Sequence, residues 1–329
     1  MKHGSGKQMA ALALAAVLML SGSASALFGK KEAPAEGVEG APVARDLEIT
    51  TYRGIPYTAQ LLASDSEGDD LTFSVAQGPK KGTVTIDGAN FTYTPKERTT
   101  GGDRFTYTAT DSNGNVSLPA TVTVTIEKAR SGVTYSDLEG NDAAVAAQCL
   151  AERGIFVGSM IGGQYRFEPE AEVTRSEFLA MVLETAGREV TAVTMTGFSD
   201  DEAIPTWAKA YASAGAADGV VRGKVTEEGP AFRGSESITF SEAATMMDRV
   251  LDTEDVDLDV WYADREAVPS WAAQAVCNME AVSVLPAASF GTLDLERAVT
   301  RADAAKMIAG VLALLEGRPE ETGLFGWNQ

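Results

Sequence analysis

One pattern constrains the second half of the chain more than any other: a threonine followed three residues later by an acidic residue. It occurs three times, with intervals of 65 and 61 residues, as Thr174 with Glu177, Thr239 with Glu242, and Thr300 with Asp303. Apolar residues at helical spacing follow each copy, so the pattern indicates a capping box. In such a box the threonine accepts from a first-turn amide and the acid reaches back to the cap amide. Three helices therefore begin in the same way, and this half is expected to contain three copies of one unit.

Each copy contains more than the capped helix. An aromatic residue and, two positions later, an aspartate open the copies; the aspartates are Asp137, Asp200 and Asp264. In the second and third copies a first helix begins with Pro-x-Trp-Ala, which supplies Trp207 and Trp271, whereas the first copy has Asp142 there. Each amphipathic helix pair must bury its apolar face against the others. We therefore expect three helical units, at 133–190, 195–252 and 258–316.

Glycine-rich turns follow the first helix in two of the copies. Gly154 and Gly219 stand just past the predicted helix and favour a left-handed C-cap. Ser283 occupies this position in the third copy. The turn of the third copy is therefore expected to differ.

Together these units resemble S-layer homology domains, through the aspartate-aromatic opening, the Trp-Ala helix, the Gly-x-x-x-Gly turn and the Thr-Arg helix start. The resemblance implies an all-α domain with pseudo-threefold symmetry, in which the capped helices pack at the centre and grooves lie between neighbouring copies. It also implies non-covalent binding of a secondary cell-wall polysaccharide, often through an acidic or pyruvylated sugar.

By position, Arg175 and Arg301 occupy the arginine of the helix-start motif, and Phe240 replaces it in the second copy. A guanidinium at the positive end of a helix can hold a sugar carboxylate in a bidentate contact. An arginine there can equally pair with a nearby acid of the protein. The resemblance therefore makes the two arginines candidate polysaccharide-binding residues and predicts one or two working grooves rather than three.

The tryptophans and the opening aspartates are further candidates for the same site. Trp207 and Trp271 could stack on a sugar face, although a tryptophan at a helix start is about as often a core anchor. Asp137, Asp200 and Asp264 are expected to cap or brace the groove more often than to touch the ligand.

Before the helical copies, residues 43–128 alternate apolar residues with threonine or serine. The alternating runs are 71–75, 83–86, 91–94, 105–108 and 121–126. Such alternation is typical of strands with one buried and one exposed face, and Asp87-Gly88 predicts a hairpin turn. About seven strands in roughly 85 residues indicate an antiparallel β-sandwich.

This segment resembles bacterial cadherin-like or immunoglobulin-like domains. The resemblance is carried by residues 42–46 (PVARD), 64–72 (SDSEGDDLT), 81–84 (KGTV), 91–95 (FTYTP) and 102–107 (GDRFTY). It implies the sandwich fold, while roles as spacer, adhesion module or carbohydrate-contact module stay open.

An oxygen-rich loop in the same segment contains Asp65, Glu67, Asp69 and Asp70. Calcium takes six to eight oxygen ligands, which clustered carboxylates and loop carbonyls can supply. Aspartate, asparagine and glycine also belong in ordinary turns. The loop is therefore a candidate calcium site, although an ordinary solvated turn is the favoured interpretation. A second loop of this kind holds Asp111, Asn113 and Asn115, and nothing in the sequence places the two side by side.

The N-terminal segment has the pattern of a secretory signal peptide over 1–26. Two lysines precede an apolar stretch, and the small-residue site Ala24-Ser25-Ala26 follows it. The apolar stretch is too short to span a membrane. Residues 27–42 are rich in Ala, Gly, Pro and Glu and are expected to form a linker, and 317–329 a flexible tail.

Composition excludes several classes of function. The one histidine, His3, lies in the predicted signal peptide, so the mature chain would lack histidine-based catalytic groups and His-ligated zinc. The net charge of −20 and the absence of a basic stripe argue against nucleic-acid binding. Cys149 and Cys277 could form a disulfide after export or stay buried as thiols, and the sequence leaves both open.

The sequence thus predicts a non-enzymatic, secreted surface protein, anchored to cell-wall polysaccharide at the S-layer by three helical repeats and displaying an Ig-like domain. The alternative is an adhesin or surface scaffold subunit whose β-sandwich binds a glycan or protein, with the repeats only a tether.

Overall fold

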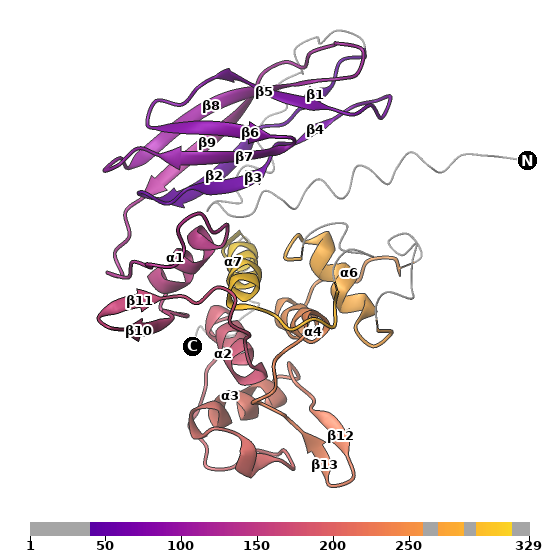
Figure 1. The fold of residues 1–329 in the computed structure, drawn as a ribbon. Coiled ribbons are helices and arrows are strands. Elements are labelled where there is room, and N and C mark those ends of the chain that lie inside the picture. Colours follow the sequence, from indigo (N-terminus) through magenta and orange to yellow (C-terminus); the bar gives the residue numbers. More distant parts are fainter. Residues whose placement is uncertain (1–39, 259–268, 286–293, 318–329) are drawn as a thin grey trace, which may run out of the picture. The chain divides into compact units, whose positions relative to one another are not determined.

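The computed structural model describes residues 40–258, 269–285 and 294–317 (Figure 1). The chain divides into two compact units, one reaching to Glu152 and the other running from Arg153 to Leu315. The first unit contains the long strands and helix α1 (Ala144–Glu152). The predicted signal peptide (1–26), most of the linker (27–42) and nearly all of the tail (317–329) lie outside the described residues.

Two main sheets form the strand-rich part of the first unit, and they confirm the predicted sandwich. One sheet has the order β2 (Leu47–Tyr52), β9 (Ala120–Glu127), β8 (Gly101–Thr110), β5 (Thr72–Gln77). The other has the order β3 (Tyr57–Gln60), β7 (Asn90–Pro95), β6 (Gly82–Asp87). A short pair is formed by β1 (Val43–Ala44) and β4 (Ala63–Ser64). All five alternating runs predicted as strands lie in strands, except for Leu71 at the start of the first run. Apolar residues such as Phe91 and Phe105 fill the core, whereas Val75 is exposed.

The prediction of a purely antiparallel sandwich is wrong at one pair of strands. β2 and β9 run parallel, from Leu47 opposite Val122 to Tyr52 opposite Glu127. Parallel neighbours need a long crossover connection. Here the intervening strands supply it, because the chain passes through the second sheet before β9 returns beside β2.

The helical part contains five further α-helices among the described residues. They are α2 (Arg175–Thr185), α3 (Thr206–Ala217), α4 (Phe240–Leu251), α6 (Ala273–Ala281) and α7 (Arg301–Gly317). Two short hairpins interrupt the expected helix-loop-helix pattern: β10 (Ser159–Ile161) with β11 (Gln164–Arg166), and β12 (Lys224–Thr226) with β13 (Gly229–Ala231). These hairpins were not predicted from the sequence, because strands of three residues show no clear alternation.

All three predicted capping boxes are present. The amide of Thr174 donates to Glu177 Oε2 at 2.8 Å, that of Thr239 to Glu242 Oε2 at 3.4 Å, and that of Thr300 to Asp303 Oδ2 at 3.1 Å. Each threonine hydroxyl in turn accepts from the amide of its acid, at 3.2 to 3.3 Å. The repeated threonine-acid pattern therefore sets the starts of α2, α4 and α7.

The turn after the first helix is more alike in the three copies than predicted. Gly154 and Gly219 have φ of 69° and 74°, as expected for left-handed caps. Ser283 has φ of 55°, although a side chain disfavours this conformation. The expectation of a different turn in the third copy is thus wrong at its first position.

Three backbone hydrogen bonds join the residues just before the capping threonines into a closed ring. The amide of Val173 donates to the carbonyl of Val299 at 2.9 Å, that of Val299 to Ile238 at 2.8 Å, and that of Ile238 to Val173 at 2.9 Å. All three residues are buried. One residue from each copy therefore meets the other two in cyclic order.

A second set of backbone hydrogen bonds, one turn further on, also joins the three copies cyclically, but from donor to acceptor it runs in the opposite sense. Each helix start donates its second amide to a carbonyl in the loop before another capped helix: Ser176 to Gly234, Ser241 to Leu295, and Ala302 to Pro169. The loop that precedes each capped helix is thus held by the helix of a different copy.

Candidate functional site

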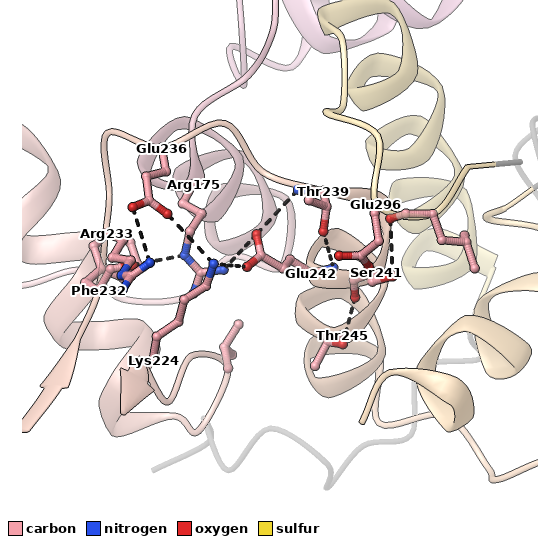
Figure 2. A network of polar contacts seen from close by, with 12 residues as sticks. Arg175, Lys224, Phe232, Arg233, Glu236, Thr239, Ser241, Glu242, Thr245 and Glu296 are labelled. Carbon is pink, nitrogen blue, oxygen red and sulfur yellow. Dashed lines mark hydrogen bonds and ion pairs between the residues drawn. The ribbon is translucent and has the colours of Figure 1, made fainter. Parts of the chain in front are cut away.

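A cavity of about 450 Å³ lies in the helical unit, where residues from all three copies meet. Its polar walls come from the start of α2, the segment before and into β12, and one face of α4, and Trp271 of the third copy completes it. Figure 2 shows much of the polar network on these walls. The charged lining residues are Arg175, Arg222, Lys224, Glu242, Arg249 and Glu296.

Arg175, the motif arginine of the first copy, lies on this cavity but is only 6% exposed. Its Nε donates to the carbonyl of Phe232 at 3.0 Å, and its guanidinium carbon lies 5.6 Å from the centre of the Phe232 ring. Its Nη1 is 3.3 Å from Glu242 Oε2, and both side chains are less than a tenth exposed. The guanidinium is therefore held by groups of the protein itself (Figure 2).

Glu242 caps its own helix and also forms ion pairs with two cations. Lys224 Nζ lies 3.0 Å from its Oε1, while Arg175 lies beside its Oε2. The bond from its cap amide, at 3.4 Å, is longer than the 2.8 Å of the corresponding bond in α2. The carboxylate thus neutralises two cations at some expense to the capping box.

Arg222 and Arg249 complete the positive lining of the cavity. Arg249 Nη1 donates to the carbonyl of Val220 at 3.0 Å, while Arg222 is exposed. Burial lowers the pKa of Arg249, and the positive charges of Arg222 and Arg175 lower it further, against the opposing effect of Asp248. Among the described residues neither Arg222 nor Arg249 forms a salt bridge. These two side chains therefore contribute positive charge that no carboxylate of the described chain cancels by contact.

Sequence reasoning missed both of these arginines. Arg222 stands inside the Gly-x-x-x-Gly turn, where the first copy has Val157, and Arg249 stands on α4, where the first copy has Glu184. A comparison of the copies at these two positions would have found the difference in charge.

Trp271 lines the same cavity and is 58% exposed, so its ring is available to a ligand. Trp207, at the same motif position of the second copy, is also about half exposed but is not among the lining residues. Its ring makes an edge contact with Tyr211, whose hydroxyl donates to Glu184 at 2.6 Å. Neither tryptophan is a core anchor, and only Trp271 shares the cavity with the cations.

Arg301, the other motif arginine, makes the same kinds of contact as Arg175, but through a different nitrogen and with a different ring and acid. Its Nη1 donates to the carbonyl of Phe167 at 3.1 Å and to Glu168 Oε2 at 2.7 Å, and it lies 5.4 Å from the centre of the Phe156 ring. The first copy offers no cations equivalent to Arg222, Lys224 and Arg249, since it has Val157, Ser159 and Glu184 there.

Phe240 stands where the other two copies have the motif arginine, and an arginine from another part of the chain lies against its ring. The guanidinium of Arg297 lies 4.7 Å from the centre of the Phe240 ring and also contacts Asp303 at 3.0 Å. This helix start thus also has an arginine against an aromatic ring. Here the aromatic residue stands at the motif position and the arginine comes from outside the motif.

Asp200 braces the loop that Arg175 contacts. Its two carboxylate oxygens accept from the amides of Phe232 and Arg233, both at 2.7 Å. The carboxylate thus holds the backbone of this loop. Asp137 is half-buried and belongs to the first compact unit, and Asp264 lies outside the described residues.

The two oxygen-rich loops of the sandwich do meet, through a bond from Asn113 Nδ2 to Asp69 Oδ2 at 3.0 Å. Asp65 Oδ1 accepts from the amides of Glu67 and Gly68 at 2.8 and 3.0 Å, as in an ordinary turn. Within the described ranges, no group of three or more histidine, cysteine, aspartate or glutamate residues is placed to hold a metal ion. The calcium prediction for Asp65, Glu67, Asp69 and Asp70 gains no support from these contacts.

No disulfide joins Cys149 and Cys277. Cys277 is buried, and burial raises the pKa of its thiol to about 12, with Glu280 adding to the effect. In the described part of the chain, no helix is both long enough and apolar enough to span a membrane.

Known proteins are similar to this chain over the β-sandwich, and the similarity continues into the helical part. Exoglucanase XynX of Acetivibrio thermocellus is 28% identical over 208 residues, which are 62% of this chain and 18% of that protein. Amylopullulanase of Thermoanaerobacterium thermosulfurigenes is 29% identical over 186 residues, which are 54% of this chain and 9% of that protein. The chain therefore spans less than a fifth of the length of either relative.

Among solved structures, endo-fucoidan hydrolase MfFcnA4 from glycoside hydrolase family 107 matches 27% of this chain and 14% of that chain. The identity is 26% and the TM-score is 0.24. The family comparison is more informative, because residues 39–126 match the model of the bacterial Ig domain. The chain thus carries a bacterial Ig domain, followed by a helical region that the 208-residue likeness must also include.

Proposed function

We propose that this chain is a non-enzymatic surface protein, anchored through three S-layer homology repeats to an anionic cell-wall polysaccharide and displaying its Ig domain. The cavity carries this proposal. Three arginines and a lysine line it together with the exposed ring of Trp271, and all three copies contribute to its walls. Cations suit an acidic sugar substituent, and an exposed indole suits a sugar face.

Pseudo-threefold symmetry of the repeats is part of the proposal. The closed ring through Val173, Ile238 and Val299 supports it, as do the cyclic bonds from the helix starts to the loops. Both sets relate equivalent positions of the three copies, which is what a threefold arrangement requires.

The comparisons support an accessory rather than a catalytic role. Two relatives with different named activities, an exoglucanase and an amylopullulanase, share segments of this chain that make up 18% and 9% of their lengths. A segment common to enzymes that act on different substrates is better explained as a module for attachment than as a catalytic centre.

The test is co-sedimentation of the purified protein with wall sacculi, native and stripped of polysaccharide. We expect binding to native sacculi only. Trp271→Ala should weaken it about tenfold, the equivalent of about 1.4 kcal/mol, because a stacking surface is lost. Trp207→Ala is the matched control, since it removes an equally exposed indole from the same motif position outside the cavity. Equal binding to native and stripped sacculi would contradict the proposal.

A further inference from the structure

The charged groups on the cavity are not equally available to a ligand, and Arg175 is the least available. Its Nε is bound to the carbonyl of Phe232, its Nη1 lies beside Glu242, and its side chain is only 8% exposed. A ligand anion that takes the place of Glu242 at Nη1 of Arg175 must displace a carboxylate that is itself only 8% exposed. That displacement would leave a buried carboxylate without one of its two cationic partners, which is unfavourable.

Lys224 is also paired with carboxylates of the protein, although less completely than Arg175. Its Nζ lies 3.0 Å from Glu242 Oε1 and 3.8 Å from Glu236 Oε2, although its side chain is 44% exposed. Arg175 and Lys224 therefore share the charge of one buried carboxylate before any ligand arrives (Figure 2).

Arg222 and Arg249 are in the opposite situation. Neither forms a salt bridge within the described ranges, and the positive charge of Arg222 acts on the guanidinium of Arg249. Two cations on one cavity repel each other, and an anion bound between them or beside them relieves that repulsion. The chain as a whole carries a net charge of −20, whereas the lining of this cavity has more positive than negative side chains.

We propose that Arg222 and Arg249 are the residues that contact the anionic group of the ligand, and that the motif arginine Arg175 is a positioning residue. The ligand is a sugar that bears a carboxylate or phosphate substituent, with Trp271 on the same cavity to take the sugar face. This rests on the proposed function for its biological setting. The assignment of the two arginines, however, can be tested without a cell wall.

The experiment uses the full chain with two defined probes, tri-galacturonic acid for the carboxylate and glucose 6-phosphate for the phosphate, and maltotriose as the neutral sugar. Affinity is measured by calorimetry, and the Nε–Hε resonances of the arginine side chains are followed by NMR during the titration. We expect one or both charged probes to bind, maltotriose to bind far more weakly, and the resonances of Arg222 and Arg249 to shift and saturate together. The Arg175 resonance should move least of the three.

Variants separate contact from positioning. Arg222→Gln with Arg249→Gln should weaken binding of the charged probe at least about tenfold without lowering the thermal unfolding temperature. Arg166→Gln, which removes an exposed arginine of β11 outside the cavity, is the control and should bind like the wild type. Arg175→Lys should lower the unfolding temperature, and at a temperature where it stays folded its affinity should fall less than that of the double variant.

The inference is overturned if neither charged probe binds the wild-type chain, or if the double variant keeps wild-type affinity. It is also overturned if the Arg175 resonance shifts most. Failure of the proposed function has a different signature. In that case the charged probe binds through Arg222 and Arg249, yet the protein does not distinguish native from stripped sacculi.

Discussion

Arg175 and Arg301 occupy the same position of the same motif, and their comparison separates what the motif determines from what its surroundings determine. Both donate to the carbonyl of a phenylalanine and both lie against an aromatic ring. Their acids differ: Glu242 is 9% exposed in its side chain, whereas Glu168 is 42% exposed. The motif therefore determines where the arginine lies, and residues outside the motif determine whether a charged cavity forms beside it.

The largest expected effect tests this difference directly. Arg175→Ala should destabilise the helical unit by about 3 kcal/mol, because it leaves Glu242 buried with only Lys224 as partner. Arg301→Ala should cost about 1 kcal/mol or less, since Glu168 can be solvated. Urea unfolding followed by the helical circular dichroism signal gives both values. Equal losses for the two variants would show that the exposure of the acid does not matter here.

A middle-sized effect extends the comparison to Phe240, where the motif arginine is missing. Phe240→Arg should destabilise the unit by about 2 kcal/mol, because it places a second guanidinium at a buried site beside Arg297. Combining it with Arg297→Glu should recover about 1 kcal/mol or more in a double-mutant cycle. Strict additivity of the two changes would indicate that Arg297 does not compensate for the lost motif residue.

The smallest effect concerns Asp201, which the second copy has where the first has Leu138. A hydrogen bond from Lys209 lowers the pKa of Asp201 from 3.8 to about 2, with further bonds from the amide and hydroxyl of Thr196. A folded-state pKa below the unfolded value means that the carboxylate stabilises the fold above pH 3.8, and that this contribution is lost as the pH falls through about 2.

The measurement is unfolding free energy against pH for the wild type and Asp201→Asn. The variant should be slightly less stable at neutral pH, and the difference between the two proteins should shrink as the pH falls from 4 toward 2. A difference that stays constant over this range would assign the effect of the substitution to something other than the charge.

Local signals in the sequence predicted most of the fold. The threonine-acid pairs mark the starts of α2, α4 and α7, and alternation marks the strands of the sandwich, because both depend on interactions between residues close in the chain. The parallel pairing of β2 with β9 was not predictable in this way, since it joins residues about 75 positions apart.

The candidate site was predicted less completely, for a related reason. Arg175 and Trp271 were named from motif positions and do lie on one cavity. The motif of a single copy cannot show that Arg175 is already paired with Glu242, because this ion pair joins two copies. Arg222 and Arg249 belong to no motif, and their importance depends on a cavity that exists only when three copies meet.

The ring through Val173, Ile238 and Val299 is made only of peptide groups, and this determines which substitutions the repeats tolerate. Any residue except proline keeps a peptide N–H and C=O, so the bonds that join the copies place few demands on side-chain chemistry at the neighbouring helix starts. Position 240 thus carries phenylalanine where the other two copies carry arginine, and the copies are joined all the same. A protein joined in this way can lose, move or reverse the charge beside each helix start separately, while the hydrogen bonds between peptide groups that join the copies stay in place.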